Sequence, residues 1–425
     1  MSMIHEPVCL RRPALHRACP MAAGARVALE YALRRVGSAA LLPGGRRLGA
    51  AGVAPSIEFL DPDAAFERMG HQPNLGVGES YMAGDWRAVP GVDLATAMLP
   101  FARQLVAPQP PAVALVRRTV NRALPRETRN TVIQARRNIE AHYDLGNDMF
   151  ESFLDDTLTY SSARFDRTLA LAEQSLEDAQ VRKIEFALDR AGVGEGTRLL
   201  EIGTGWGTLA ILAARRGARV TSITISPAQA DLARQRIAAA GVSELVSVEL
   251  RDYREQLGRF DAVVSIEMIE AVGEEFLPGY FAAIERALVP GGRAVLQAIL
   301  MTEERFQATR NSYGWIQKHI FPGGLIPSVG ALQRAAEPTG LRITPVDLFG
   351  LDYAETLNRW RARFLDNWPQ VREMGFDDVF ARRWEFYLAY CEAGFTAGAI
   401  DVGQLVVERV GTGRDDPVPA AAHAG

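Results

Sequence analysis

An apolar segment that breaks into a glycine-rich turn constrains the fold of this chain more than any other feature. Residues 199–202 have the pattern of a buried strand, Gly203, Gly205 and Gly207 follow at alternate positions, and residues 209–216 have the pattern of a helix. Glycine adopts positive φ and lets a ligand approach the backbone, and a helix N-terminus offers free N–H groups. The stretch indicates a nucleotide-binding βα turn, with a tight turn that binds no ligand as the alternative.

The spacing of these glycines favours S-adenosylmethionine over NAD. The pattern is G-x-G-x-G rather than G-x-G-x-x-G, and the strand before it carries Glu201. A dinucleotide fold places its ribose-binding carboxylate about 20 residues after the glycines. Here the second strand, residues 219–225, ends at Thr224 and is followed by Ser226, without a carboxylate.

The remaining pattern predicts a doubly wound α/β sheet of the Rossmann-like class. Ligands of such sheets bind at the carboxyl ends of the strands, where Gly203, Thr224, Asp252 and Glu267 fall. The predicted strands are residues 199–202, 219–225, 246–250, 262–266 and 293–299. The predicted helices are residues 172–191, 209–216, 227–240 and 277–288.

The 425-residue chain divides into a smaller and a larger domain. A basic helical pattern at residues 27–36 fits either a membrane-surface helix or a surface helix of a small domain, and both interpretations stay open. The aromatic-rich residues 301–328 are too long for a turn and predict a lid. The predicted parts are a mobile extension (1–23), a small α+β domain (24–105), a basic linker (106–134), the α/β domain (135–410) and a disordered tail (411–425).

Composition excludes several classes of protein. A net charge of −4 does not suggest nucleic-acid binding. The three cysteines, Cys9, Cys19 and Cys391, have no paired spacing, so we expect neither disulfides nor a metal site, as suits a reducing cytoplasm. No apolar run reaches the roughly 18 residues of a membrane span.

Five segments, in matching order, resemble the cyclopropane-fatty-acyl-phospholipid synthase family of S-adenosylmethionine-dependent methyltransferases. Residues 78–86 also resemble the N-terminal domain of longer bacterial members. Residues 267–273 and 297–299 are similar to the subgroup that makes 10-methyl (tuberculostearic-type) fatty acids. The five segments are residues 142–148, 158–161, 200–207, 317–324 and 387–395.

The resemblance implies an anion site and raises a question about the product. Family members bind bicarbonate through a cysteine, a glutamate, a histidine, a backbone group at isoleucine and a tyrosine. Ala271 also stands where cyclopropane-forming members usually carry histidine. A cyclopropane and a methylene- or methyl-branched chain therefore both remain open. The positions that match the bicarbonate ligands are Ser162, Glu270, Gln297, Ile299 and Tyr353.

The resemblance further implies that a cis double bond attacks the sulfonium methyl and leaves a carbocation on the acyl chain. Ring faces attract cations, although core packing is the alternative for each aromatic. Glu270, with Tyr353 and with or without bicarbonate, is expected to organise the base; the alternative is a cap or ion pair on the next helix. The candidate ring faces are Tyr143, Tyr160, Trp315, Phe321 and Tyr353.

Cofactor contacts are expected along the strand ends. Tyr160 and Ser161 should close over the methionine moiety, and Tyr253 should stack on the adenine beside Asp252. Cys391 lies in a motif whose cysteine has been treated as catalytic in the family, but a buried structural cysteine is expected here. The other expected contacts are Leu199, Leu200, Glu201, Ile202, Gly203, Thr204, Gly205, Trp206, Gly207, Thr224, Ile225, Ser226 and Gln229.

The implied substrate is the unsaturated acyl chain of a phospholipid, reached by peripheral binding to the inner face of the cell membrane. A separate reductase would turn a methylene branch into a methyl branch, and a homodimer is compatible with the sequence. Two other classes compete with this interpretation: a non-catalytic lipid-binding protein on a methyltransferase scaffold, and an NAD-dependent oxidoreductase. The glycine spacing and the intact Glu201, Gly203, Gly205 and Glu270 disfavour both.

Overall fold

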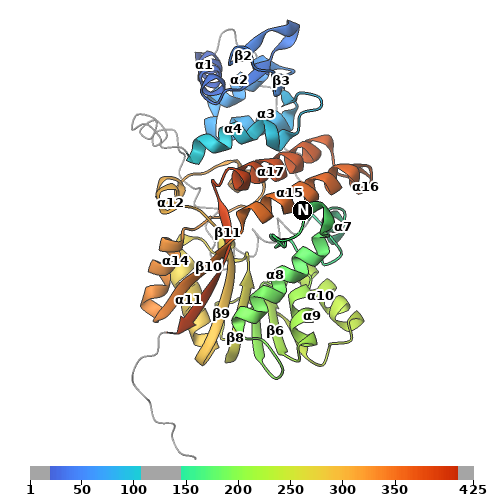
Figure 1. Cartoon of the computed structure of the whole chain (residues 1–425), viewed down its shortest axis with the longest axis vertical. Helices are drawn as coiled ribbons and strands as arrows, with labels where there is room; N and C mark the ends of the chain where they lie inside the picture. The colour runs from blue at the N-terminus through green and yellow to red at the C-terminus, as the bar shows by residue number, and fades with distance from the viewer. Residues whose placement is uncertain (1–19, 107–144, 410–425) are drawn as a thin grey trace, which may run out of the picture.

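The computed structural model describes residues 20–106 and 145–409, which form a small N-terminal domain above a larger α/β domain (Figure 1). The N-terminal domain has a four-stranded sheet in the order β2-β1-β3-β4. β1 pairs antiparallel with β2 and parallel with β3, and β3 pairs antiparallel with β4. Its elements are α1 (Pro20–Arg35), β1 (Ala39–Leu41), η1 (Pro43–Gly45), β2 (Arg47–Gly49), β3 (Ile57–Phe59), α2 (Pro62–His71), α3 (Pro73–Ala83), β4 (Trp86–Ala88) and α4 (Leu94–Val106).

The α/β domain is built on a seven-stranded sheet in the order β10-β11-β9-β8-β5-β6-β7. The five strands from β9 to β7 are parallel, while β11 runs antiparallel to both β9 and β10. Leu199, Leu200, Val263 and Val264 are buried, as expected for central strands covered on both faces. The strands are β5 (Arg198–Ile202), β6 (Arg219–Thr224), β7 (Val246–Leu250), β8 (Phe260–Ile266), β9 (Leu288–Leu300), β10 (Leu341–Leu348) and β11 (Asp401–Arg409).

Helices cover both faces of this sheet, and side-chain caps fix where several begin. The Ser175 hydroxyl accepts from the backbone N–H of Asp178 to start α8, and Gly192 ends that helix with a positive φ of 71°. Ser226 starts α10 in the same way. The helices and 3-10 turns of this part are η3 (Leu171–Glu173), α8 (Leu176–Ala191), α9 (Thr208–Arg215), α10 (Pro227–Ala239), η4 (Ile269–Ala271), η5 (Glu274–Phe276), α11 (Leu277–Ala287), α14 (Val329–Ala336) and η6 (Glu337–Thr339).

A third layer lies between the carboxyl ends of the parallel strands and the N-terminal domain (Figure 1). In it α15 packs on α17, and α17 contacts α3 and α4 of the N-terminal domain. Its core is aromatic, with Phe153 against the rings of Trp360 and Trp384. The layer consists of α7 (Asn147–Glu151), α12 (Glu303–Thr309), α13 (Trp315–His319), α15 (Gly350–Asp366), α16 (Trp368–Glu373) and α17 (Asp378–Thr396).

The predicted fold class is confirmed, since the sheet is mostly parallel and carries a smaller N-terminal part. The first helix begins at Pro20, earlier than the predicted boundary at residue 24, and residues 76–86 contribute to α3 and β4. The predicted linker from residue 107, the tail, and Tyr143 lie outside the described residues. Within residues 20–106 and 145–409, no helix combines the length and apolarity needed to cross a bilayer.

Candidate active site

The glycine turn after β5 forms a bare backbone surface at the edge of a large cavity. Gly203, Gly205 and Gly207 all have positive φ, at 100°, 52° and 89°. A Cβ on Gly205 would meet no atom within 4 Å, so this position borders open space. At Gly207 an added Cβ would lie 3.2 Å from Cβ of Ala233, so that glycine serves the packing of α9 on α10. The space at Gly205 fits the close approach of a cofactor.

The hydroxyl of Ser222 and the carbonyl of Ile223, both in β6, hold the glycine turn in place. The Ser222 hydroxyl lies 2.5 Å from Oε2 of Glu201 and 2.7 Å from Oγ1 of Thr204. Glu201 is buried, and burial raises the pKa of its carboxyl to about 8 although the hydrogen bond from Ser222 acts in the opposite direction. The backbone N–H groups of Gly203 and Thr204 both donate to the carbonyl of Ile223. Neighbouring β6 therefore holds the turn in place.

The expected ribose and adenine side lies at the ends of β6 and β7. Oγ1 of Thr224 donates to Oε1 of Gln229 at 3.0 Å, so these two side chains support each other at the start of α10. Asp252 accepts from the guanidinium of Arg254 at 2.7 Å. Tyr253 packs edge-on against Tyr280, with ring centroids 5.2 Å apart. Thr224, Gln229, Asp252 and Tyr253 all line the cavity.

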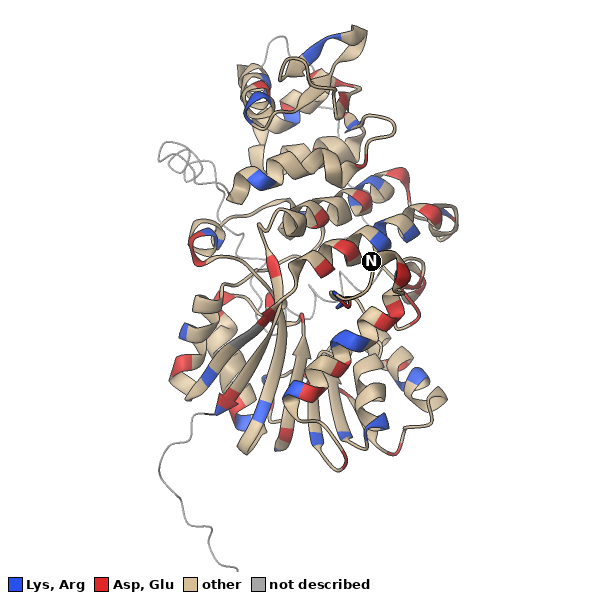
Figure 2. Cartoon of the chain, viewed as in Figure 1, with Lys and Arg blue, Asp and Glu red and all other residues tan. Residues whose placement is uncertain are grey.

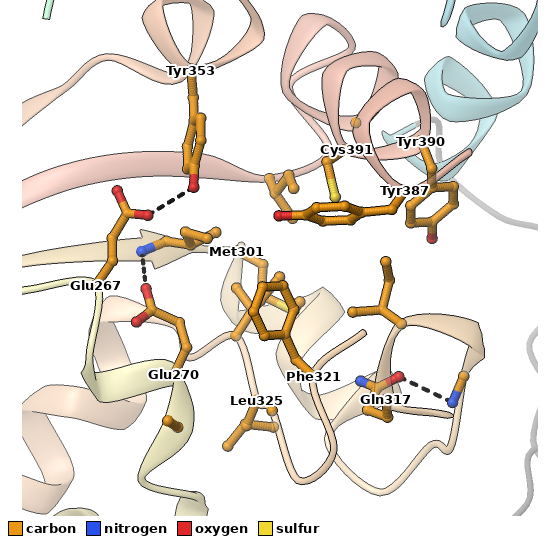
Figure 3. Close-up of a pocket in the computed structure, with 18 of the residues that line it drawn as sticks. Glu267, Glu270, Met301, Gln317, Phe321, Leu325, Tyr353, Tyr387, Tyr390 and Cys391 are labelled. Atoms are coloured by element: carbon orange, nitrogen blue, oxygen red, sulfur yellow. Dashed lines mark hydrogen bonds between the residues drawn. The ribbon is translucent and has the colours of Figure 1, made fainter. Parts of the chain in front are cut away.

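The most unusual feature of the site is the carboxylate of Glu267, at the end of β8. Its Oε1 accepts from the backbone N–H of Ser162 at 2.9 Å and from Nε2 of Gln297 at 2.8 Å. Its Oε2 accepts from the Tyr353 hydroxyl at 2.8 Å (Figure 3). The backbone of Glu267 has φ +48°, a region that non-glycine residues rarely adopt. Strain of this kind clusters at functional sites.

Glu270 lies beside Glu267 and completes a carboxylate pair (Figure 3). Its Oε1 accepts from the backbone N–H of Ile299 at 2.5 Å, while its buried Oε2 has no hydrogen-bond partner among the described residues. Burial and the neighbouring Glu267 together raise the pKa of Glu270 to about 8. Glu270 therefore presents a carboxylate oxygen that is free to accept a proton.

The residues expected to bind bicarbonate lie around the carboxylate pair. Of these five residues, Ser162, Gln297, Ile299 and Tyr353 each donate to Glu267 or Glu270, and the fifth is Glu270 itself. Binding of bicarbonate at these positions stays a prediction.

A buried lysine interacts electrostatically with Glu267. Lys183 of α8 is fully buried, and its Nζ donates to Oγ of Ser161 at 2.6 Å. Burial lowers the pKa of Lys183 to about 8, against the attraction of Glu267 and Asp155. The sequence reading missed Lys183, although it falls in the buried register of α8 with Ala179 and Ala187. It also placed Glu267 at a strand end without giving it a role.

The cavity has a volume of about 1730 Å³. Figure 3 shows the carboxylate pair on one side, Tyr387, Tyr390 and Cys391 of α17 above, and Phe321 and Leu325 of the lid segment (residues 301–328) below. The Tyr160 hydroxyl lies 2.8 Å from that of Tyr387. Burial raises the pKa of the Cys391 thiol to about 12, which argues against a nucleophilic thiolate.

The structure brings most of the predicted site residues to this one cavity. Among the expected aromatic side chains Tyr160, Trp315, Phe321 and Tyr353 line it. The other predicted residues on the wall are Ser161, Glu201, Ile202, Gly203, Thr204, Gly205, Trp206, Thr224, Ile225, Gln229, Asp252, Tyr253, Glu270, Ile299 and Cys391. Those behind the wall are Ser162, Leu199, Leu200, Gly207, Ser226 and Gln297.

Comparison with known proteins assigns this architecture to a family. The family model described as mycolic acid cyclopropane synthetase matches residues 130–405. The chain belongs to this family. It is therefore an S-adenosylmethionine-dependent methyltransferase, and the predicted family and enzyme class are confirmed.

Several known proteins are similar to this chain over most of its length. A tuberculostearic acid methyltransferase of Mycobacterium tuberculosis is 48% identical over 362 residues, which are 84% of each protein. The cyclopropane-fatty-acyl-phospholipid synthase of Escherichia coli K12 is 32% identical over 373 residues, 84% of this chain and 89% of the relative. A mycolic acid cyclopropane synthase solved with SAH and CTAB has a TM-score of 0.58 at 30% identity, covering 67% of this chain and 98% of that one.

Proposed function

We propose that this methyltransferase adds a one-carbon unit to the cis double bond of an unsaturated fatty acyl chain of a phospholipid, and that its product is a methylene branch. The observation that carries the proposal is the carboxylate pair of Glu267 and Glu270 at the wall of an aromatic-lined cavity. S-adenosylmethionine, when bound at Gly203 and Gly205, supplies the methyl group. The similarity to the tuberculostearic acid methyltransferase supports the branched product.

The residues of this chain have three tasks in the reaction. The glycine turn and the aromatic wall hold the two reactants in line, which supplies much of the acceleration. When the double bond takes the methyl, the neighbouring chain carbon becomes a carbocation. The faces of Tyr160, Phe321 and Tyr353 and the negative charge of the carboxylate pair stabilise that cation.

The final task is to remove a proton, and Oε2 of Glu270 is the acceptor. A hydride shift from the methylated carbon to its neighbour moves the cation to the branch point. Loss of a proton from the new methyl then leaves an exocyclic C=CH₂, whereas loss before the shift closes a cyclopropane. Glu267 is held by Ser162, Gln297 and Tyr353, and its charge raises the proton affinity of Glu270. A pKa near working pH suits a general base.

Product analysis tests this function. Purified enzyme is incubated with S-adenosylmethionine and vesicles of a cis-monounsaturated phospholipid, and the released fatty acids are analysed by mass spectrometry and proton NMR. We expect a mass gain of one CH₂ together with exocyclic methylene protons. A cyclopropane as the sole product would refute the branched product, and no mass gain at all would refute the lipid substrate. A separate reductase would be needed for a methyl branch.

We also propose that the enzyme works in the cytoplasm as a peripheral protein on the inner membrane surface, because its substrate chains lie in the bilayer. Exposed arginines on the N-terminal domain, Arg34, Arg35, Arg46 and Arg47, support contact with anionic lipid (Figure 2). The alternative of a non-catalytic lipid-binding protein is not favoured, because the carboxylate pair and the glycine turn are intact and the family consists of methyltransferases.

A further inference from the structure

The cavity of the active site continues from the carboxylate pair to the N-terminal domain. Its volume of about 1730 Å³ exceeds the roughly 300–1,000 Å³ of a pocket for one small ligand. The same space is bordered by Gly205 and Glu270 in the α/β domain and by Phe59 and Met98 in the N-terminal domain. It therefore has room for a long second ligand that extends away from the cofactor.

The part of the wall supplied by the N-terminal domain is hydrocarbon-like. Among the described residues of this domain, those on the wall include no charged side chain, and Asn74 is the single side-chain amide. By contrast, Glu267, Glu270 and Lys183 lie on the α/β side. The main apolar wall residues of the N-terminal domain are Leu29 of α1, Ile57 and Phe59 of β3, Met69 of α2, and Met98 and Phe101 of α4.

Specific contacts fix this apolar wall relative to the reaction site. Gly78 of α3 lies so close to the ring of Trp315 that a Cβ there would come within 2.4 Å of it. The Tyr81 hydroxyl donates to Oε2 of Glu385 at 2.8 Å. Glu79 forms an ion pair with Lys318 at 2.5 Å, and its Oε1 lies within hydrogen-bond distance of Nε2 of His319, at 3.0 Å. The distance from the carboxylate pair to the apolar wall is therefore set by the fold.

We propose that the N-terminal domain receives the methyl-terminal end of the acyl chain and limits how many carbons can lie beyond the double bond. This proposal rests on the proposed function, because the double bond must lie at the carboxylate pair. The apolar wall suits the methyl end and not the ester end, since a buried ester or phosphate would lose its hydrogen bonds to water without replacement. Hydrocarbon gains free energy from the same burial.

The test uses two series of monounsaturated phospholipids with the full-length enzyme. In the tail series, the number of carbons beyond the double bond varies while the carboxyl side stays constant. In the head series, the carboxyl side varies while the tail stays constant. Met98→Trp and Leu29→Trp should lower kcat/KM for long tails relative to short tails by about tenfold or more, because each methylene in a tight apolar pocket is worth that much. Phe101→Ala should shift the preference to longer tails.

The chain offers a matched control on the same helix as Leu29. Val27 lies two residues away, is 68% exposed and is absent from the wall, so Val27→Trp should leave both series unchanged. Calorimetric binding of S-adenosylmethionine to each variant checks that the α/β domain is intact. An unchanged tail preference in Met98→Trp and Leu29→Trp, or a change in the head series instead, would overturn the proposal. Wild-type enzyme inactive on every lipid would refute the proposed function itself.

Discussion

At the scale of single residues, cofactor binding depends on the backbone of Gly205. Valine at φ +52° would be strained by roughly 1–2 kcal/mol, and its side chain would enter the open space beside the turn. We expect Gly205→Val to weaken the affinity for S-adenosylmethionine by roughly 100-fold or more, measured by calorimetry. Gly241 has φ +72° and open space around it, so Gly241→Val is a control for strain alone. If a folded Gly205→Val variant kept micromolar affinity for S-adenosylmethionine, Gly205 would be excluded as part of the cofactor site.

We expect a substitution in the carboxylate pair to affect catalytic turnover but not cofactor binding. Glu270→Gln removes the proton acceptor, so turnover should fall to background while calorimetry still shows cofactor binding. Equal loss of both would assign Glu270 a structural role instead.

Glu267→Gln should change the pH dependence of the reaction. Burial and the negative charge of Glu267 both raise the pKa of Glu270, so removing that charge lowers this pKa. The ionised form of Glu270 accepts the proton, so activity rises with pH through this pKa. The acidic limb of the kcat profile should therefore move to lower pH, by about one unit. Glu337→Gln, a substitution at an exposed carboxylate of η6, should leave the limb where it is.

Sequence reasoning located Glu270 and Tyr353 through resemblance and Glu267 through its place at a strand end. It could not foresee that Glu267 would accept hydrogen bonds from Ser162, Gln297 and Tyr353. That outcome depends on a positive φ at residue 267 and on donors that come from positions 162, 297 and 353. Contacts so distant along the chain leave no local pattern in the sequence.

At the scale of elements, the contact between α3 and α13 joins the N-terminal domain to the lid segment. Gly78→Ala would place a methyl group against the ring of Trp315 and should destabilise the protein by about 1–3 kcal/mol in denaturant unfolding. Limited proteolysis should then cut the lid segment faster. Gly24→Ala in α1 is the matched control, since a Cβ there meets nothing within 4 Å and should stabilise that helix by roughly 0.5–1 kcal/mol. Equal stability of the two variants would contradict the role of this contact.

The elements also show where sequence patterns succeed. The predicted strand at residues 246–250 matches β7, and the helix predicted from Pro227 begins there, because apolar periodicity and a serine cap are local signals. The sequence pattern of residues 73–83 does not indicate the helix α3. Gly76 and Gly78 weaken its helix propensity, but Gly76 permits close contact with the backbone of Arg68 and Gly78 permits contact with Trp315. Tertiary contacts of this kind leave no pattern in the local sequence.

At the scale of the whole molecule, two domains were predicted from composition and turn signals, but their shared cavity was not. The N-terminal domain lies over the carboxyl ends of the parallel strands, with α15 and α17 between (Figure 1). Arg361 of α15 forms ion pairs with both Asp93 and Glu392, which links the layers. The N-terminal domain is thus part of the substrate chamber in our proposal, rather than a separate module.

The whole molecule carries a net charge of −4, so attraction to an anionic membrane must be local. Four exposed arginines of the N-terminal domain, Arg34, Arg35, Arg46 and Arg47, are the candidate contact. Each basic residue near an anionic surface contributes about 1 kcal/mol to the attraction. At physiological ionic strength salt screens this attraction at distances beyond about 8 Å. We expect the enzyme to float with anionic vesicles at low salt and to be released at high salt.

Replacing these four arginines with alanine should abolish flotation while the affinity for S-adenosylmethionine is retained. The control replaces four exposed arginines of the α/β domain, so that net charge changes equally but at a different place: Arg215, Arg219, Arg286 and Arg342. Flotation that ignores both anionic lipid and salt would contradict membrane contact through this surface. Equal loss in the two quadruple variants would point to net charge as the cause, because a local contact must distinguish them. If neither variant lost flotation, the chain would have to reach its lipid substrate through apolar contact, which salt does not screen.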